Sequence, residues 1–193
     1  FRLGGPGDAA RRGKPPGYMK SYQAMSSELP LAGRKPWWKG ARGEWFVVAQ
    51  LVAIGLVWLG PRGPVVEPAW LPAFPQAGAV AGIVLMVVGA AMLLAGFLGL
   101  GSGLTALPYP KDGADLVEAG VFGLVRHPIY SGLVMAGFGW ALFVQARLTL
   151  AYVAVLFVVL DMKARREERW LVEKFPAYAA YERRVRRLIP FVY

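Results

Sequence analysis

The chain has 193 residues, of which 56% are hydrophobic and 18% are charged, and it contains no cysteine. This composition excludes disulfide scaffolds, iron–sulfur clusters, cysteine-ligated zinc and thiol catalysis, and it argues against a water-soluble globule of this size. His127 is the single histidine, so a metal site would have to be built from carboxylates, and none is expected.

The net charge of +10 arises from 22 Lys and Arg residues against 12 Asp and Glu residues. Nine of the basic residues lie in residues 1–43 and nine in 161–193, which leaves four for the long apolar middle of the chain. A nucleic-acid-binding face would spread them differently, whereas this bias is typical of membrane topology. The sequence therefore predicts an integral membrane protein that contacts membrane lipids and has no nucleic-acid partner.

The N-terminal segment, residues 1–43, is rich in Gly, Pro and basic residues, and we expect it to be poorly ordered up to about Pro30. Between Arg34 and Trp45, tryptophans alternate with Lys and Arg, a pattern that suits the lipid headgroup region. Residues 44–193 are expected to form the membrane domain.

Apolar stretches in that domain predict an all-α membrane protein with a cytoplasmic helical tail, 163–193. About four transmembrane helices are expected, at about residues 44–60, 77–100, 128–146 and 148–162. The last is short for a span unless Lys163 and Arg165 snorkel to water. Residues 145–148 are expected to form the tip of a helical hairpin. The positive-inside rule places both termini and the 101–127 loop in the cytoplasm.

Glycines recur at heptad spacing in the second predicted span, at Gly82, Gly89 and Gly96. Such a stripe lets another helix approach closely, which is our interpretation. A glycine-lined groove for a ligand is the alternative.

The next polar block is Arg126-His127-Pro128-Ile129-Tyr130. Because Pro128 suits the first position of a helix and disfavours a helical His127, the third span is predicted to begin there. A helix N-terminus beside Arg126 is a good seat for a carboxylate, with hydrogen-bonding groups on His127 and Tyr130 at the same depth. Anchoring of the helix end to headgroups is the alternative.

A second polar block contains Glu167 and Glu168, on a helix that is expected to end near Phe175. Adjacent side chains on a helix point about 100° apart, so only one of the two carboxylates can readily face inward. A solvated face with i,i+4 pairs, Lys163 with Glu167 and Arg169 with Glu173, is the alternative. The tail then carries an apolar stripe that indicates packing or membrane contact: Leu171, Phe175, Tyr178, Tyr181, Val185 and Leu188.

Together these blocks resemble the isoprenylcysteine carboxyl methyltransferase family, which belongs to a wider group with phosphatidylethanolamine N-methyltransferases. The resemblance covers roughly residues 95–193. Its motifs are TALPYP (105–110), DLVEAG (115–120), RHPIYSG (126–132), the pair Glu167-Glu168, and Phe175, Tyr178, Tyr181 and Pro190. This chain departs from the pattern at Gly120-Val121-Phe122, where many relatives have Gly-Pro-Tyr.

The resemblance implies a membrane enzyme that uses S-adenosylmethionine to methylate a lipophilic small-molecule or lipidated acceptor, of which isoprenylcysteine is one option. It implies a cofactor pocket formed by Leu116, Val117, Gly120, Leu124, Val125, His127, Pro128, Tyr130, Glu167 and Glu168. Arg126 is expected to hold an acceptor carboxylate, and Glu167 or Glu168 to contact the cofactor. Catalysis would then rest mainly on positioning and on exclusion of water.

Two other functions are compatible with the sequence. Membrane sterol reductases, which use NADPH, have a similar C-terminal region with an RHxNY-like block and an ending like Ile189–Tyr193, but Ile129 stands where Asn is expected. A non-catalytic membrane anchor or subunit, whose basic tails bind anionic lipid or a partner, is the other alternative.

Overall fold

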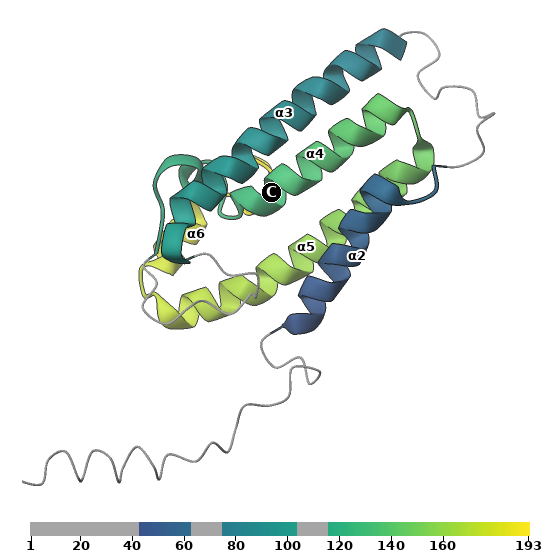
Figure 1. Ribbon diagram of the computed structural model, residues 1–193. Coiled ribbons are helices and arrows are strands. Elements are labelled where there is room, and N and C mark those ends of the chain that lie inside the picture. The colour runs from purple at the N-terminus through teal and green to yellow at the C-terminus, as the bar shows by residue number, and fades with distance from the viewer. Residues whose placement is uncertain (1–42, 63–74, 104–115) are drawn as a thin grey trace, which may run out of the picture. The chain divides into compact units, whose positions relative to one another are not determined.

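The computed structural model describes residues 43–62, 75–103 and 116–193, and these residues are mainly helical (Figure 1). The helices are α2 (Glu44–Leu59), α3 (Pro75–Leu100), α4 (Pro128–Val144), α5 (Arg147–Lys174) and α6 (Tyr178–Arg184), with 3-10 turns η3 (Gly101–Gly103) and η4 (Gly120–Gly123). In the described part no β-strand forms, and one isolated bridge joins Val125 to Arg186. The all-α prediction is therefore confirmed for these residues. The tryptophans of the expected headgroup segment before Gly43, the 105–110 motif and Asp115 lie outside them.

Helix α3 is long and apolar enough to cross a membrane, and the most apolar window within Gln76–Leu100 has a mean hydropathy of 2.6. Only 11% of its most apolar window is buried inside the protein, as expected for a helix whose surface faces lipid. Helices α2 and α4 are apolar but shorter. Among the described residues, length and composition thus support one of the four predicted spans, and the other three stay predictions.

The helix boundaries around the predicted hairpin follow the expected signals. Pro128 occupies the first turn of α4 with His127 as its N-cap, because proline lacks the N–H that a helix start leaves unpaired. Helix α4 ends at Val144 and is capped by Gln145, whose φ of 54° is left-handed, and α5 begins at Arg147. Helix α5 then continues into the charged tail and is capped by Phe175, directly before Pro176.

Helices α3 and α4 pack side by side through their glycines (Figure 1). A Cβ atom on Gly89 would lie 2.7 Å from the Gly132 carbonyl oxygen, and one on Gly132 would lie 2.6 Å from the Gly89 carbonyl oxygen. Gly82 and Gly139 face each other in the same way. The glycine stripe is therefore a helix-packing surface, which confirms our interpretation over the alternative of a ligand groove.

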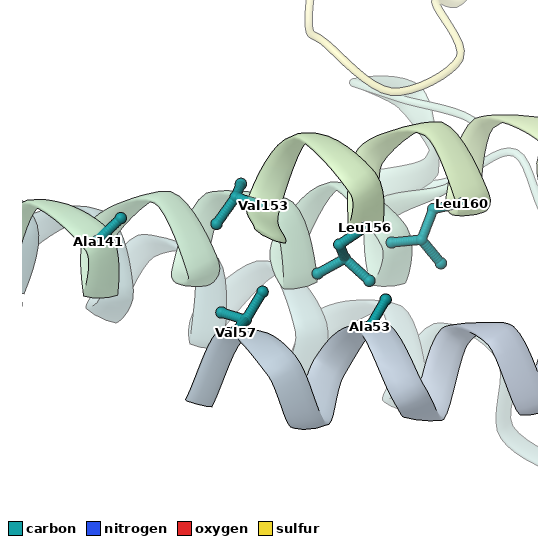
Figure 2. Close-up of a cluster of buried hydrophobic side chains, with 6 residues drawn as sticks. All are labelled: Ala53, Val57, Ala141, Val153, Leu156 and Leu160. Carbon is teal, nitrogen blue, oxygen red and sulfur yellow. The ribbon is translucent and has the colours of Figure 1, made fainter. Parts of the chain in front are cut away.

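Helix α2 packs along α5 through an apolar cluster, shown in Figure 2. Ala53 and Val57 of α2 point toward Leu156 and Leu160 of α5. Trp58 of α2 also contacts Trp140 of α4, with ring centroids 5.2 Å apart. These contacts hold α2, α4 and α5 together and leave the polar end of α5 to form the site.

The apolar stripe of the tail forms a second buried cluster. Tyr178, Tyr181 and Val185 are its buried members, and Leu171 and Phe175 pack against them together with Leu116. The Tyr181 hydroxyl donates to the Phe122 carbonyl oxygen over 2.7 Å, and burial raises the pKa of Tyr181 to about 12. The apolar stripe of the tail thus packs inside the protein and holds the tail against η4. Of the two expectations for this stripe, packing and membrane contact, packing is confirmed.

Candidate functional site

The chain after α6 lies beside the residues that precede α4. The backbone N–H of Arg126 donates to the Arg186 carbonyl over 2.8 Å, and that of His127 donates to the Arg187 carbonyl over 3.1 Å. The Ser131 hydroxyl donates to the Leu188 carbonyl over 2.6 Å. Backbone pairing therefore brings the basic tail against the start of α4, facing the charged half of α5.

Arg126 is buried, and all of its donors point at protein oxygens. Its Nε and one terminal nitrogen lie 2.8 and 2.7 Å from Glu168 Oε1. The other terminal nitrogen donates to the carbonyls of Glu182 and Val185. A guanidinium has five N–H groups, and four contacts within hydrogen-bond distance leave one, on the nitrogen that has the Glu182 carboxylate 3.6 Å away as a further ionic partner. Burial excludes headgroup anchoring by Arg126, and the geometry favours a different role from the expected one of holding an acceptor carboxylate.

Glu168 is the centre of this ionic cluster, with a side chain that is only 6% exposed. Besides Arg126, its Oε1 has His127 Nε2 at 3.2 Å, and its Oε2 accepts two contacts of 2.8 Å from the Arg187 guanidinium. Burial would raise the pKa of Glu168, but the hydrogen bond and charge of His127, together with those of Arg126, hold it down at about 2. Glu168 is therefore a carboxylate at any physiological pH.

Glu167, the residue before Glu168 on α5, also faces the start of α4. The Tyr130 hydroxyl donates to Glu167 Oε2 over 2.9 Å, and His127 Nδ1 lies 3.7 Å from that oxygen. The His127 and Tyr130 rings stack in parallel with centroids 5.2 Å apart. The side chain of Glu167 is 24% exposed, which leaves it more accessible than Glu168. The solvated-face alternative does not hold for this pair, because both carboxylates bind the α4 block.

Lys163 lies one turn of α5 before Glu167 and is 2% exposed. Its ammonium donates to Gln50 Oε1 of α2 over 2.6 Å and lies 5.1 Å from the centre of the Tyr130 ring. The expectation that Lys163 snorkels to water is wrong, because its side chain turns into the bundle. The side chain of Arg165 does reach the surface and is 57% exposed.

The other expected cofactor residues are less closely gathered. Leu116 belongs to the tail cluster, and Val117 beside it is half-buried. Gly120 has a φ of +63°, which an L side chain would strain, and it is exposed with Leu124 on or next to η4. Val125 and Pro128 are buried beside the ionic cluster. The structure thus brings together His127, Tyr130, Glu167 and Glu168, and Arg126 is bound to Glu168.

Sequence reasoning missed Arg187, Asp161 and Gln50. Arg187 lies within 3.3 Å of Asp161 Oδ1 as well as binding Glu168, but in the sequence it is one of several tail arginines. Its role depends on the register between residues 125–127 and 186–188, which no local pattern shows. Gln50 did carry a signal, since it is a lone polar residue in an apolar stretch.

The chemistry of these side chains fits S-adenosylmethionine, which carries an ammonium, hydroxyls and a carboxylate. Glu167 is an accessible acceptor for an ammonium or a hydroxyl group. The Tyr178 hydroxyl is buried and has no hydrogen-bond partner among the described residues. Burial and then the nearby carboxylate of Glu168 raise the pKa of Tyr178 far above its ordinary value, so its hydroxyl stays a donor.

The fold and the site define a helical membrane protein whose apolar helices carry a buried ionic cluster at one end. A family model, described as phospholipid methyltransferase, matches residues 77–178, and the chain belongs to that family. The matched region contains the α4 block and both glutamates. Membership of the narrower isoprenylcysteine family stays an expectation.

The chain is also similar to the Delta(14)-sterol reductase of Mus musculus, with 33% identity over 96 residues. The similarity covers 48% of this chain and 23% of the reductase, so the chain spans less than a quarter of that relative.

Proposed function

We propose that this membrane methyltransferase transfers a methyl group from S-adenosylmethionine to a lipophilic acceptor at the cytoplasmic face of the membrane. The observation that carries the proposal is the convergence of His127 and Tyr130 with Glu167 and Glu168 at one end of the bundle. Those residues lie within the region that the phospholipid methyltransferase model matches. The membrane domain would be residues 44–193, with both termini in the cytoplasm.

The residues of the ionic cluster divide into those that touch the cofactor and those that position them. S-adenosylmethionine supplies an activated methyl group on a sulfonium. Glu167 accepts from an ammonium or hydroxyl of the bound cofactor, while Tyr130 and His127 hold the orientation of its carboxylate. We assign Arg126 to positioning Glu168 instead of to the acceptor, because its N–H groups are already engaged within the protein.

The remaining expected pocket residues would shape the cofactor site around this cluster. These six residues lie before or at the start of α4 and would form the apolar wall of the cofactor site: Leu116, Val117, Gly120, Leu124, Val125 and Pro128. We expect the acceptor to bind on the side of α2, a helix that is outside the matched region. An isoprenylcysteine carboxylate is one acceptor that this proposal allows.

Calorimetric titration with S-adenosylhomocysteine, on the detergent-purified full chain, tests the proposal. We expect saturable binding that is lost in a His127→Ala, Glu167→Ala double variant. Glu173→Gln is a matched control, because Glu173 is an exposed carboxylate on the same helix and lies beyond the cluster. Wild-type protein that fails to bind S-adenosylhomocysteine would contradict the proposal.

NADPH-dependent reduction is the second candidate, and the similarity to a sterol reductase favours it. The same titration with NADPH separates the two, since binding of NADPH alone would select the reductase. Binding of neither molecule would select the non-catalytic anchor or subunit.

A further inference from the structure

We propose that Lys163 and Gln50 form an oxyanion-binding site for the polar head of the acceptor, a lipid that carries a carboxylate or a phosphate. The proposal rests on the proposed function and adds the residues that recognise the acceptor. It starts from a buried ammonium on α5 whose hydrogen-bond partner is a neutral amide on α2.

The burial of Lys163 is the first support. Lys163 is only 2% exposed, and it lies on the same inward face of α5 as the buried residues Leu156 and Leu160. A buried ammonium costs free energy unless an anion or several hydrogen bonds compensate it. Among the described residues its hydrogen bond goes to Gln50 Oε1, which is neutral and uses one of the three ammonium donors.

The carboxylates nearest to Lys163 along α5, those of Glu167 and Asp161, are bound to other side chains. Glu167, one turn along α5, attracts the ammonium electrostatically but has its Oε2 bound to the Tyr130 hydroxyl. Asp161 is bound by Arg165 and Arg187. No carboxylate of the described residues lies within ion-pair distance of Lys163, whereas Glu168 has both Arg126 and Arg187. Among the buried basic residues that the structure describes, Lys163 is therefore the one without a carboxylate partner.

The donors and their place suit an oxyanion from the lipid side. The amide nitrogen of Gln50 adds two N–H groups, and it is bonded to the same carbon as the oxygen that Lys163 contacts. Helix α2 presents Leu51 and Val52 as exposed apolar residues beside Gln50, which is the surface that a lipid chain would meet. The Tyr130 ring contacts both the Lys163 ammonium and the His127 ring, so an oxyanion held here would lie near the proposed cofactor site.

Binding of three lipids with the same oleoyl chain and different heads tests this site. Tritiated oleate is bound to the immobilised full-length protein in a non-ionic detergent, without any cofactor. Unlabelled oleate, oleoyl lysophosphatidate and monooleoylglycerol then compete, which compares a carboxylate, a phosphate and a neutral head. We expect at least one anionic lipid to bind more tightly than monooleoylglycerol, and the preferred one identifies the head.

Charge variants decide whether Lys163 is responsible. Lys163→Met is expected to weaken the preferred anionic lipid about ten-fold or more, because a charge-assisted hydrogen bond is lost, and to leave monooleoylglycerol unchanged. Lys163→Arg should keep the preference. Lys174→Met is the matched control, since Lys174 lies on the same helix about three turns further along.

Gln50→Glu separates anion binding from a bracing role between α2 and α5. The new carboxylate would pair with Lys163 and preserve the contact between the helices, so the thermal midpoint should not fall. It would also occupy the ammonium, so the preference for the anionic lipid should disappear. This variant remains decisive if Lys163→Met does not fold.

Three results would overturn the inference: equal binding of the neutral and both anionic lipids, an anionic preference that survives in Lys163→Met, or one that survives in Gln50→Glu. Titration of the same preparations with S-adenosylhomocysteine keeps the proposals apart. Cofactor binding without anionic preference would overturn the lysine site alone, and anionic preference without cofactor binding would overturn the methyltransferase proposal.

Discussion

At the scale of single residues, the site depends on which partner each charged group has. The Glu168 carboxylate contacts the side chains of Arg126, His127 and Arg187, whereas the Glu167 carboxylate accepts a hydrogen bond from Tyr130. The two neighbouring carboxylates therefore differ: that of Glu168 is buried within the ionic cluster, and that of Glu167 is partly exposed to solvent.

The low pKa of Glu168 predicts how stability changes with pH. A carboxylate whose pKa falls from 4.5 to about 2 on folding contributes its full stabilisation above pH 4.5, and this stabilisation is lost as the pH falls toward 2. We expect the wild type to melt at a higher temperature than Glu168→Gln by a constant margin above pH 4.5, and this margin should shrink at lower pH. Thermal unfolding in detergent between pH 7 and pH 2.5 measures it, and a margin independent of pH would contradict the assignment.

Arg187 should stabilise the protein more than an arginine at the surface. Arg187→Met removes the contacts with Glu168 and Asp161 and is expected to lower the free energy of unfolding by about 1.5–3 kcal/mol, the range for hydrogen bonds to charged groups. Arg184→Met removes an exposed pair with Glu118 and should cost less than about 1 kcal/mol. Unfolding in mixed detergent micelles measures both variants, and equal losses would count against the cluster.

The sequence predicted the members of this cluster better than their roles. Pro128 and the adjacent glutamates have local signals, so the start of α4 and the presence of one inward-facing carboxylate could be foreseen, but not that this carboxylate is Glu168. The role of Arg126 could not, because its partners include backbone carbonyls of Glu182 and Val185, more than fifty residues away in the chain. Lys163 was misjudged for the same reason, since Gln50 is on another helix.

At the scale of elements, helix lengths and junctions were readable, because they depend on local chemistry. Proline at the start of α4, the turn at Gln145 and the end of α5 before Pro176 all follow from nearby residues. The glycine stripe predicted that α3 packs closely against another helix, but the sequence did not show that this helix is α4. The pairing of α2 with α5 through Ala53 and Leu156 has no such periodic signal.

The glycine contact between α3 and α4 gives a prediction at this scale. A methyl group on Gly89 would meet backbone atoms at 2.7 Å, so Gly89→Ala is expected to force the helices apart and to cost about 1–3 kcal/mol of unfolding free energy. In contrast, a methyl group on Gly55 of α2 meets nothing within 4 Å, and Gly55→Ala should stabilise the protein by up to about 1 kcal/mol. Unfolding measurements on the two variants compare them directly. A neutral Gly89→Ala would show that the helices can separate without cost.

At the scale of the whole molecule, the proposed orientation can be tested with cysteine labelling, because the chain has no cysteine of its own. Arg147 is an exposed residue at the start of α5, and Arg183 is an exposed residue of α6. If the tail is cytoplasmic, a membrane-impermeant maleimide should label Arg147→Cys in intact cells and Arg183→Cys only after permeabilisation. Labelling of Arg183→Cys in intact cells would reverse the orientation.

The pairing of residues 125–127 with 186–188 also bears on the order in which the site assembles during synthesis. Arg187 is synthesised after both Arg126 and Glu168, so the Glu168 carboxylate is present before one of its two arginine partners. A nascent chain that has formed α4 and α5 therefore has these helices but not the finished ionic cluster. The proposed ligand site should reach its final geometry only when residues 186–188 pair with the start of α4, which places the ordering of the site after the folding of the helices that carry it.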